Sequence, residues 1–424
     1  MLKKLAIHGG AAVFNGNWPN WPQSTENTRR NIDAVLSNHR WSISGQYRGQ
    51  ASWEERFGQV FAAYTGTPFC IPSSTGTASL TMALEACEVG AHDEVIVPGV
   101  SWVASASAVL GINAIPVLTD VEPHTGCLDP VALERAITPR TRAITVVHLG
   151  SALANMNRLV AIARARSIPL IEDCAQAHGA RYADRHVGRF GTAGTFSMQH
   201  SKLLTSGEGG AVITDDAALA RRLAHLRADG RTLCVQPPGM DEMALVETAE
   251  IMGSNYCLSE FHAAILVAQL EVLDEQLALR RSNAAVLDSL LISLGFSPQA
   301  TAPGTTARSY YTYVVRLPQS VVETQGVERF AAALAAELRL PCKTMYSALN
   351  QSPLYKPFSR KRFALGKAFA DAVDPSRYQL PIAQAFSRSC IALPHRMLLA
   401  DTDAMGHVAA AFEKVAGAID DLCA

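Results

Sequence analysis

The sequence of 424 residues lacks the cysteine pattern of a disulfide framework or a zinc ribbon. Its nine cysteines include no closely spaced pair, and their total is odd, whereas both kinds of site need paired, near spacing. We therefore expect reduced thiols, buried for the most part, and no metal site. The N-terminal segment has too few apolar residues after its lysines for a signal peptide, which predicts a cytoplasmic protein.

Surplus charge of one sign and long apolar runs are also missing. The chain has 37 Lys and Arg against 38 Asp and Glu, a formal net charge of −1. Binding to nucleic acid requires a surplus of basic residues on one face, so the balance argues against that partner. Apolar runs such as Ala143 to Leu149 are far shorter than the ~20 residues that cross a bilayer, which argues against a membrane partner.

What is present from about residue 70 to 215 is an alternation of short apolar strands with helical stretches. Several of the strands are continuous in Val and Ile, which is typical of strands buried on both faces. The expected strands are Glu94 to Val97, Ala114 to Leu118, Ala143 to His148, Ile168 to Glu172, Ala193 to Ser197 and Ala211 to Thr214. The expected helices between them are Thr77 to Val89, Pro130 to Ile137 and Met156 to Ala165. This pattern predicts an α/β fold with a mostly parallel sheet, whose ligands bind at the carboxyl ends of the strands.

Beyond residue 215 the pattern becomes helical, with a long helix from Ser259 to about Ile292 and a smaller βα region from Tyr310 onward. We therefore divide the chain into an N-terminal arm with helices (1–60), a large domain (61–275) and a small C-terminal domain (276–424). The Pro-bounded aromatic segment Asn17 to Gln23 is expected to pack as an extended arm, either on its own core or near a site.

Four features follow the strands of the large domain, and each has an ordinary structural interpretation when taken alone. Ser73 to Ser79 opens a helix with small residues, as an anion site or a plain helix cap would. Trp102 could belong to the hydrophobic core, and Asp173 could cap the next helix. Lys202 could be an ordinary lysine exposed to solvent. Their common position at strand ends suggests one combined site.

The combination matches what pyridoxal 5'-phosphate needs from a protein. Its phosphate needs a cradle such as Gly76 and Thr77, its ring needs a stacking partner such as Trp102, and its aldehyde needs a lysine such as Lys202. Asp173 supplies the carboxylate that keeps the pyridine nitrogen protonated. A lysine hemmed in by apolar neighbours is partly desolvated, which favours the neutral amine that forms a Schiff base.

Two long motifs carry a resemblance to a known family. Glu172 to Gly179 reads EDCAQAHG, and Phe196 to Gly210 reads FSMQHSKLLTSGEGG. Both resemble the sugar aminotransferases of the DegT/DnrJ/EryC1/StrS family, a fold-type I pyridoxal-phosphate group. The resemblance implies a large domain with a seven-stranded type of sheet, mostly parallel, and a smaller C-terminal α/β domain. Further segments resemble the subgroup of L-glutamine:scyllo-inosose aminotransferases, namely 18–23, 40–45, 226–231 and 253–261.

The resemblance implies roles for residues around the cofactor ring. Lys202 would form the Schiff base and then move the proton between substrate and cofactor. Asp173 would pair with the pyridinium nitrogen, Gln176 would bind the ring hydroxyl, and Trp102 would stack on the ring.

It also implies a phosphate site and an assembly. Gly76 and Thr77 would donate backbone N–H groups, and Ser197 its hydroxyl, to the phosphate. Asn255 would reach the phosphate of the neighbouring subunit, which implies a homodimer with sites completed across the interface.

The subgroup implies L-glutamine as amino donor and a keto-cyclitol, scyllo-inosose or 2-deoxy-scyllo-inosose, as acceptor in aminoglycoside biosynthesis. Cys257 stands where family members commonly carry a basic residue, which agrees with an uncharged acceptor. A nucleotide-sugar aminotransferase, an enzyme like aminohydroxybenzoate synthase, and a sensor or scaffold without activity stay as alternatives. Four further residues could contact substrate or be structural: His178, His200, Tyr346 and His395. Cys174 and Cys257 are expected to serve in packing.

Overall fold

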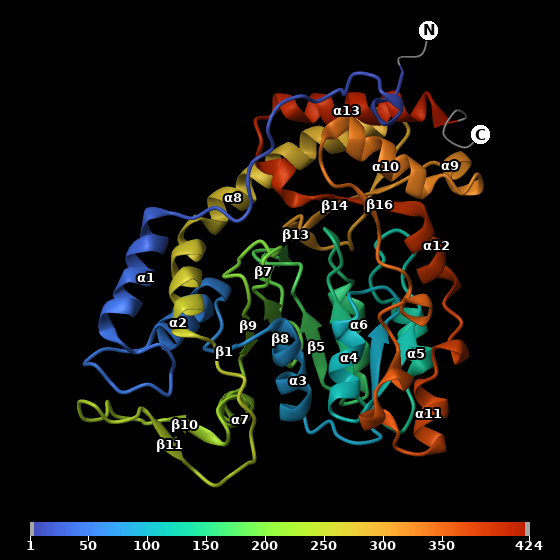
Figure 1. The fold of residues 1–424 in the computed structure, drawn as a ribbon. Helices are drawn as coiled ribbons and strands as arrows, with labels where there is room; N and C mark the ends of the chain where they lie inside the picture. Colours follow the sequence, from blue (N-terminus) through green and yellow to red (C-terminus); the bar gives the residue numbers. More distant parts are fainter. Residues whose placement is uncertain (1–3, 420–424) are drawn as a thin grey trace.

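A large and a small β-sheet organise the computed structural model of the protein, which describes residues 4–419 (Figure 1). The large sheet has seven strands in the order β1-β9-β8-β5-β4-β2-β3. Their bounds are β1 (Phe69–Ser73), β2 (Glu94–Pro98), β3 (Ile115–Thr119), β4 (Thr141–Val147), β5 (Leu170–Asp173), β8 (Ala193–Ser197) and β9 (Gly210–Thr214).

The pairing of these strands confirms the predicted α/β fold. Parallel ladders join β3 to β2, β2 to β4, β4 to β5 and β5 to β8, while β9 runs antiparallel to both β8 and β1. β2, β5, β8 and β9 are buried along their whole length. The apolar run Val95 to Val97 in β2 and the run Ala211 to Ile213 in β9 are typical of such strands. β1 is absent from the predicted strands.

Five helices cover both faces of the large sheet, and four of them are capped by polar side chains. The five are α3 (Gly76–Ala86), α4 (Ala104–Gly111), α5 (Pro130–Ala136), α6 (Met156–Ala165) and α7 (Ala217–Arg227). The side chain of Thr75 accepts from the third residue after it, and Asp129 caps α5 just before Pro130. α4 was not predicted from the sequence.

The small sheet lies above the large one in Figure 1 and forms its own core with three helices and the C-terminal half of the long helix that ends at Ser293. Its strands run in the order β12 (Ser297–Pro298), β14 (Thr312–Arg316), β16 (Cys390–Pro394) and β15 (Lys343–Thr344). The helices are α9 (Gln319–Glu323), α10 (Val327–Leu338) and α13 (Asp403–Ala416). By contrast, α11 (Lys367–Val373) and α12 (Pro381–Ser389) bury Phe369 and Phe386 in the core of the large sheet. The three-part division of the chain stays a prediction.

Helix α8 (Glu260–Ser293), 34 residues long, links the two sheets. Its first half packs on α1 (Glu26–Asn38) and α2 (Trp53–Thr65), and its second half on α13 (Figure 1). The arm before α1 runs back over the small core, where Trp18 is buried and donates its indole N–H to the carbonyl of Leu338 at 2.7 Å.

The remaining elements are short. A three-stranded sheet joins β13 (Thr305–Ala307), β6 (Arg181–Tyr182) and β7 (Arg185–His186), and a separate hairpin joins β10 (Arg231–Leu233) to β11 (Leu245–Glu247). The 3-10 turns are η1 (Ala6–His8), η2 (Leu349–Gln351), η3 (Pro357–Ser359), η4 (Lys361–Phe363), η5 (Pro375–Arg377) and η6 (His395–Leu399).

The cysteines within residues 4–419 are all free thiols, and Cys127, Cys174, Cys342 and Cys390 are buried. Cys423 lies outside the described residues. No helix over the same range is long and apolar enough to cross a membrane.

Candidate active site

A cavity of about 420 Å³ at the carboxyl ends of β5 and β8 gathers seven of the eight residues that the sequence places in the site. The sheet explains this convergence, because the loops after neighbouring parallel strands meet at one edge. The seven are Gly76, Thr77, Trp102, Asp173, Gln176, Ser197 and Lys202.

Lys202 lies in a tight turn just after β8. Its backbone N–H donates to the carbonyl of Gln199 at 2.8 Å, which closes the turn Gln199–Lys202. The Nζ atom lies over the ring of Tyr311, 4.2 Å from the centroid, where the face of the ring attracts a cation. The amine therefore stands on the cavity wall with one side packed on an aromatic face.

Asp173 ends β5 as a buried carboxylate, 6% exposed. Oδ1 accepts the N–H of Ala175 at 3.1 Å and Oδ2 accepts the hydroxyl of Ser105 at 3.2 Å. Burial raises the pKa of Asp173, while the backbone N–H and the positive charge of Lys202 partly offset that rise. A carboxylate held in this way is suited to pairing with a further cationic N–H group inside the cavity.

The N-terminus of α3 faces the cavity as an anion site. Thr75 accepts the N–H of Ala78, and no acceptor within residues 4–419 takes the N–H groups of Gly76 or Thr77. A Cβ atom on Gly76 would lie 2.5 Å from the Cβ of Ser197, so only glycine fits there. The close approach brings the Ser197 hydroxyl beside these free donors, and the helix dipole adds to their attraction for an anion.

Gln176 and Trp102 complete the walls. Gln176 Oε1 accepts the N–H of Gly150 at 2.7 Å, and its Nε2 has no acceptor in the described part of the chain, so it can donate into the cavity. The Trp102 ring is 49% exposed and tilted against Tyr346, with 5.9 Å between centroids. Its free face can take a flat ligand.

One predicted site residue lies elsewhere. Asn255 is exposed on the segment after the β10–β11 hairpin, where it pairs with Ala228 and accepts the N–H of Cys257. It does not line the cavity of its own chain.

Of the four residues whose roles were open, Tyr346 lines the cavity. His178 is buried behind it against Phe196, and burial lowers the pKa of His178 to about 3, so its imidazole is neutral. His200 is exposed, and His395 is buried at the start of η6.

Several groups at the cavity were not predicted from the sequence, among them a tyrosine and a pair of serines. Tyr311 lies just before β14 of the small sheet, and no local pattern links it to a lysine more than a hundred residues earlier. Ser101 and Ser105 are bonded to each other at 2.8 Å, and Ser105 reaches Asp173. The sequence signal for this pair is its position on either side of Trp102, shortly after the end of β2.

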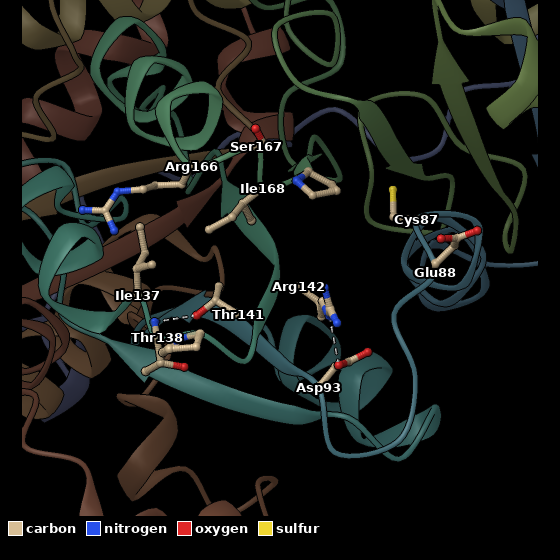
Figure 2. Close-up of a pocket in the computed structure, with 12 residues that line it drawn as sticks. Cys87, Glu88, Asp93, Ile137, Thr138, Thr141, Arg142, Arg166, Ser167 and Ile168 are labelled. Carbon is tan, nitrogen blue, oxygen red and sulfur yellow. Dashed lines mark hydrogen bonds and ion pairs between the residues drawn. The ribbon is translucent and has the colours of Figure 1, made fainter.

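A larger cavity of about 660 Å³ lies at the opposite edge of the sheet, before β2, β4 and β5 (Figure 2). No residue of the predicted site lines it. Its Arg142 and Asp93 are paired with each other at 3.4 Å. Position and chemistry therefore favour the smaller cavity as the site.

A buried trio, His148, Glu172 and Cys174, has ligand atoms close enough to suit a metal ion. Glu172, however, already accepts the N–H groups of Gly188, Phe190 and Gly191 at 2.6 to 2.8 Å. These bonds satisfy the carboxylate and fix the loop between β7 and β8, which is a structural role.

The model of the DegT/DnrJ/EryC1/StrS aminotransferase family matches residues 22–413. The chain belongs to this family. It is 56% identical to the L-glutamine:2-deoxy-scyllo-inosose aminotransferase of Streptomyces lividus and 56% identical to the L-glutamine:scyllo-inosose aminotransferase of Streptomyces griseus. Each alignment covers 98% of both proteins.

Among solved structures, 3-amino-5-hydroxybenzoic acid synthase is similar, with a TM-score of 0.80 and 30% identity over 95% of this chain and 99% of that one. These findings confirm the resemblance carried by the motifs around Asp173 and Lys202, and the fold that it implies. The protein is an aminotransferase, which disfavours the alternative of a sensor or scaffold without activity.

Proposed function

We propose that this aminotransferase uses pyridoxal 5'-phosphate to move the amino group of L-glutamine to a keto-cyclitol, scyllo-inosose or its 2-deoxy form. The observation that carries the proposal is the cavity that joins Lys202, Asp173 and the free N-terminus of α3. The names of the two relatives, each 56% identical, supply the donor and the acceptor.

The residues of the cavity fit the cofactor. Free N–H groups of Gly76 and Thr77 and the hydroxyl of Ser197 would bind the phosphate, and the close contact between Gly76 and Ser197 leaves a concave cradle. Gln176 Nε2 would donate to the ring hydroxyl, Trp102 would cover the ring, and Lys202 would hold the aldehyde group.

When bound, the cofactor draws electrons from the carbon next to the amino nitrogen and so makes its proton removable. Asp173 would keep the ring nitrogen protonated through its negative charge, which strengthens that withdrawal. Lys202 Nζ would take the proton from one carbon and return it to another, because it lies on the cavity wall and can act as both base and acid.

The charge of the cavity favours an uncharged acceptor over a nucleotide-linked sugar. Of the residues of this chain that line it, Lys202 is the single cation, and in the proposed reaction its amine would serve as the catalytic base and acid. A diphosphate would need several cationic or N–H donors, since such groups carry most of its binding. Serine and tyrosine hydroxyls around the cavity suit the hydroxyl groups of a cyclitol instead.

We further propose a homodimer in which Asn255 of each protomer reaches the phosphate in the other. Asn255 is exposed and is not among the residues that line the cavity of its own chain, and both observations support this arrangement.

The test is an assay of purified protein with L-glutamine and each keto-inosose, followed by mass spectrometry of the product. We expect replacement of the keto oxygen by an amino group, a bound chromophore, and loss of both activity and chromophore in Lys202→Ala. Lys343→Ala, an exposed lysine on β15, is the matched control and should behave as wild type. Activity retained in Lys202→Ala would refute the mechanism. Faster reaction with a nucleotide-linked keto sugar, or a product that has lost water, would refute the acceptor.

A further inference from the structure

Behind the lysine turn lies a buried arginine that has no acidic partner. Arg280, on α8, is fully buried, and no carboxylate among residues 4–419 pairs with it. Its Nε and Nη1 atoms have no hydrogen-bond partner among the described residues, and its guanidinium lies 5.0 Å from the ring of Trp21 in the N-terminal arm. Burial lowers the pKa of Arg280 to about 9, so it is still charged at neutral pH. A buried charge without a counterion costs stability, which suggests that it serves another purpose.

The one acceptor for Arg280 in the described part of the chain is His395, whose Nδ1 lies 3.2 Å from Nη2. A guanidinium can only donate, so Nδ1 carries no hydrogen and the proton of the neutral ring resides on Nε2. The charged groups around the ring are all cations: Arg280 from α8, Arg396 from η6 and Lys202 from the turn. Burial and these charges hold the pKa of His395 well below its usual range, which keeps the ring neutral.

The Nε2–H group of His395 points at the residue before the lysine. It donates to the carbonyl of Ser201 at 3.1 Å. The Ser201 side chain is fixed as well, since its hydroxyl donates to Gln199 Oε1 at 2.8 Å and lies 3.0 Å from the hydroxyl of Tyr311. Because the Ser201 hydrogen is used, Tyr311 is the donor of that second bond.

We propose that His395, held by Arg280 as the neutral Nε2–H tautomer, is a positioning residue that fixes the Ser201 carbonyl and so aims Lys202 at the reacting atoms. The relay connects α8 and the end of β16 to the lysine turn. The effect of these hydrogen bonds on turnover rests on the proposed function of Lys202. Their effect on the conformation of the turn does not depend on that function.

The decisive comparison is between His395→Phe, which keeps a ring but removes both nitrogens, and His395→Gln, whose amide can still donate to Ser201. We expect His395→Phe to lower kcat by about tenfold to a hundredfold, with little change in KM for L-glutamine, because small displacements of a reacting group slow the chemical step. His395→Gln should recover most of the loss. The matched control is Arg396→Gln, which removes a bond to the carbonyl of Pro19 in the arm and one of the three cations near the ring, but leaves both hydrogen bonds of His395 in place. Burial and Arg280, the larger causes of the low pKa of His395, still keep the ring neutral in this variant.

A second readout needs no cofactor. Amide hydrogen exchange of the cofactor-free protein, followed by mass spectrometry, should be faster across the turn Gln199–Lys202 in His395→Phe and unchanged in His395→Gln and Arg396→Gln. Unchanged exchange in His395→Phe, or an equal effect of Arg396→Gln, would overturn the inference. Faster exchange in a protein that fails to aminate the keto-inosose would overturn the proposed function and leave the positioning role intact.

Arg280→Met separates positioning from simple packing. It removes a buried charge that lacks a counterion, so the unfolding temperature should stay level or rise, yet kcat should fall because His395 loses the donor that orients it. In the double variant with His395→Phe, Arg280→Met should add little, since the two residues act in series. Two results would show that Arg280 does not act through His395. One is a lower unfolding temperature in Arg280→Met together with the lower kcat, and the other is a loss of kcat in the double variant equal to the sum of the two single losses in free energy.

Discussion

At the scale of single residues, the buried carboxylate of Asp173 lowers the stability of the cofactor-free protein at neutral pH. Burial raises the pKa of this carboxyl, so the folded protein holds a proton at pH values where the unfolded chain has lost it. The free energy of unfolding therefore falls as pH rises from the ordinary value of 3.8 through the raised pKa in the folded state. At neutral pH the cofactor-free protein bears the cost of this buried charge.

Asp173→Asn should reverse that balance. The amide does not titrate, so the cofactor-free variant should show a flatter dependence of unfolding temperature on pH and a higher value near neutrality. Turnover should fall by about a hundredfold or more, because the amide carries no charge to hold a proton on the ring nitrogen. Calorimetry from pH 4 to 8 and steady-state assays measure the two effects. Turnover within a few-fold of wild type would contradict the role given to Asp173.

At the scale of elements, the first turn of α3 has room for an anion because Gly76 has no side chain. Gly76→Ala would place a Cβ atom 2.5 Å from that of Ser197, so the helix must shift away from β8. We expect the dissociation constant of pyridoxal phosphate to rise about tenfold or more, a loss of about 1.4 kcal/mol of binding free energy or more. Absorbance titration of the cofactor-free protein measures it.

The control for this change is Gly111→Ala at the end of α4, where an added Cβ meets nothing within 4 Å. It should bind the cofactor as wild type does. Equal binding by Gly76→Ala would mean that the phosphate site does not depend on the contact between α3 and Ser197.

Elements with a strong local signal were predictable, and those without one were not. β2 and β5 follow from continuous apolar runs, and α5 from Asp129 and Pro130 at its start. β1 contains Cys70 and Pro72 and pairs along one edge only, and α4 is rich in Ala and Ser with no apolar stripe. Tyr311 and His395 reach the lysine turn only because β14 and β16 of the small sheet lie over the large sheet, and no local sequence pattern encodes that contact.

At the scale of the whole molecule, the N-terminal arm ties the small core together rather than lining the cavity. Trp18 is 8% exposed, packs 4.2 Å from Phe14 and bonds to Leu338. Trp18→Ala should lower the free energy of unfolding by about 3 kcal/mol, as loss of a buried aromatic side chain does. Ile7→Ala, on the same arm but 45% exposed, should change it by less than about 0.5 kcal/mol. Urea unfolding measures the free energy of unfolding of both variants. Similar losses in Trp18→Ala and Ile7→Ala would mean that Trp18 is not the residue that attaches the arm to the small core.

The proposed dimer places Asn255 of each protomer at the site of the other, which can be tested with mixed dimers. If Asn255 completes the site of the partner, a mixed dimer of Lys202→Ala and Asn255→Ala chains contains one site with both lesions and one intact site. Each pure variant should be nearly inactive, whereas the mixed dimer, purified through two different tags, should recover about half of the wild-type activity because the two sites of a symmetric dimer are equivalent. If Asn255 instead acted within its own chain, each site of the mixed dimer would carry one lesion and no activity would return. The recovery therefore depends on where Asn255 acts, and an inactive mixed dimer would refute the shared site while leaving the role of Lys202 untouched.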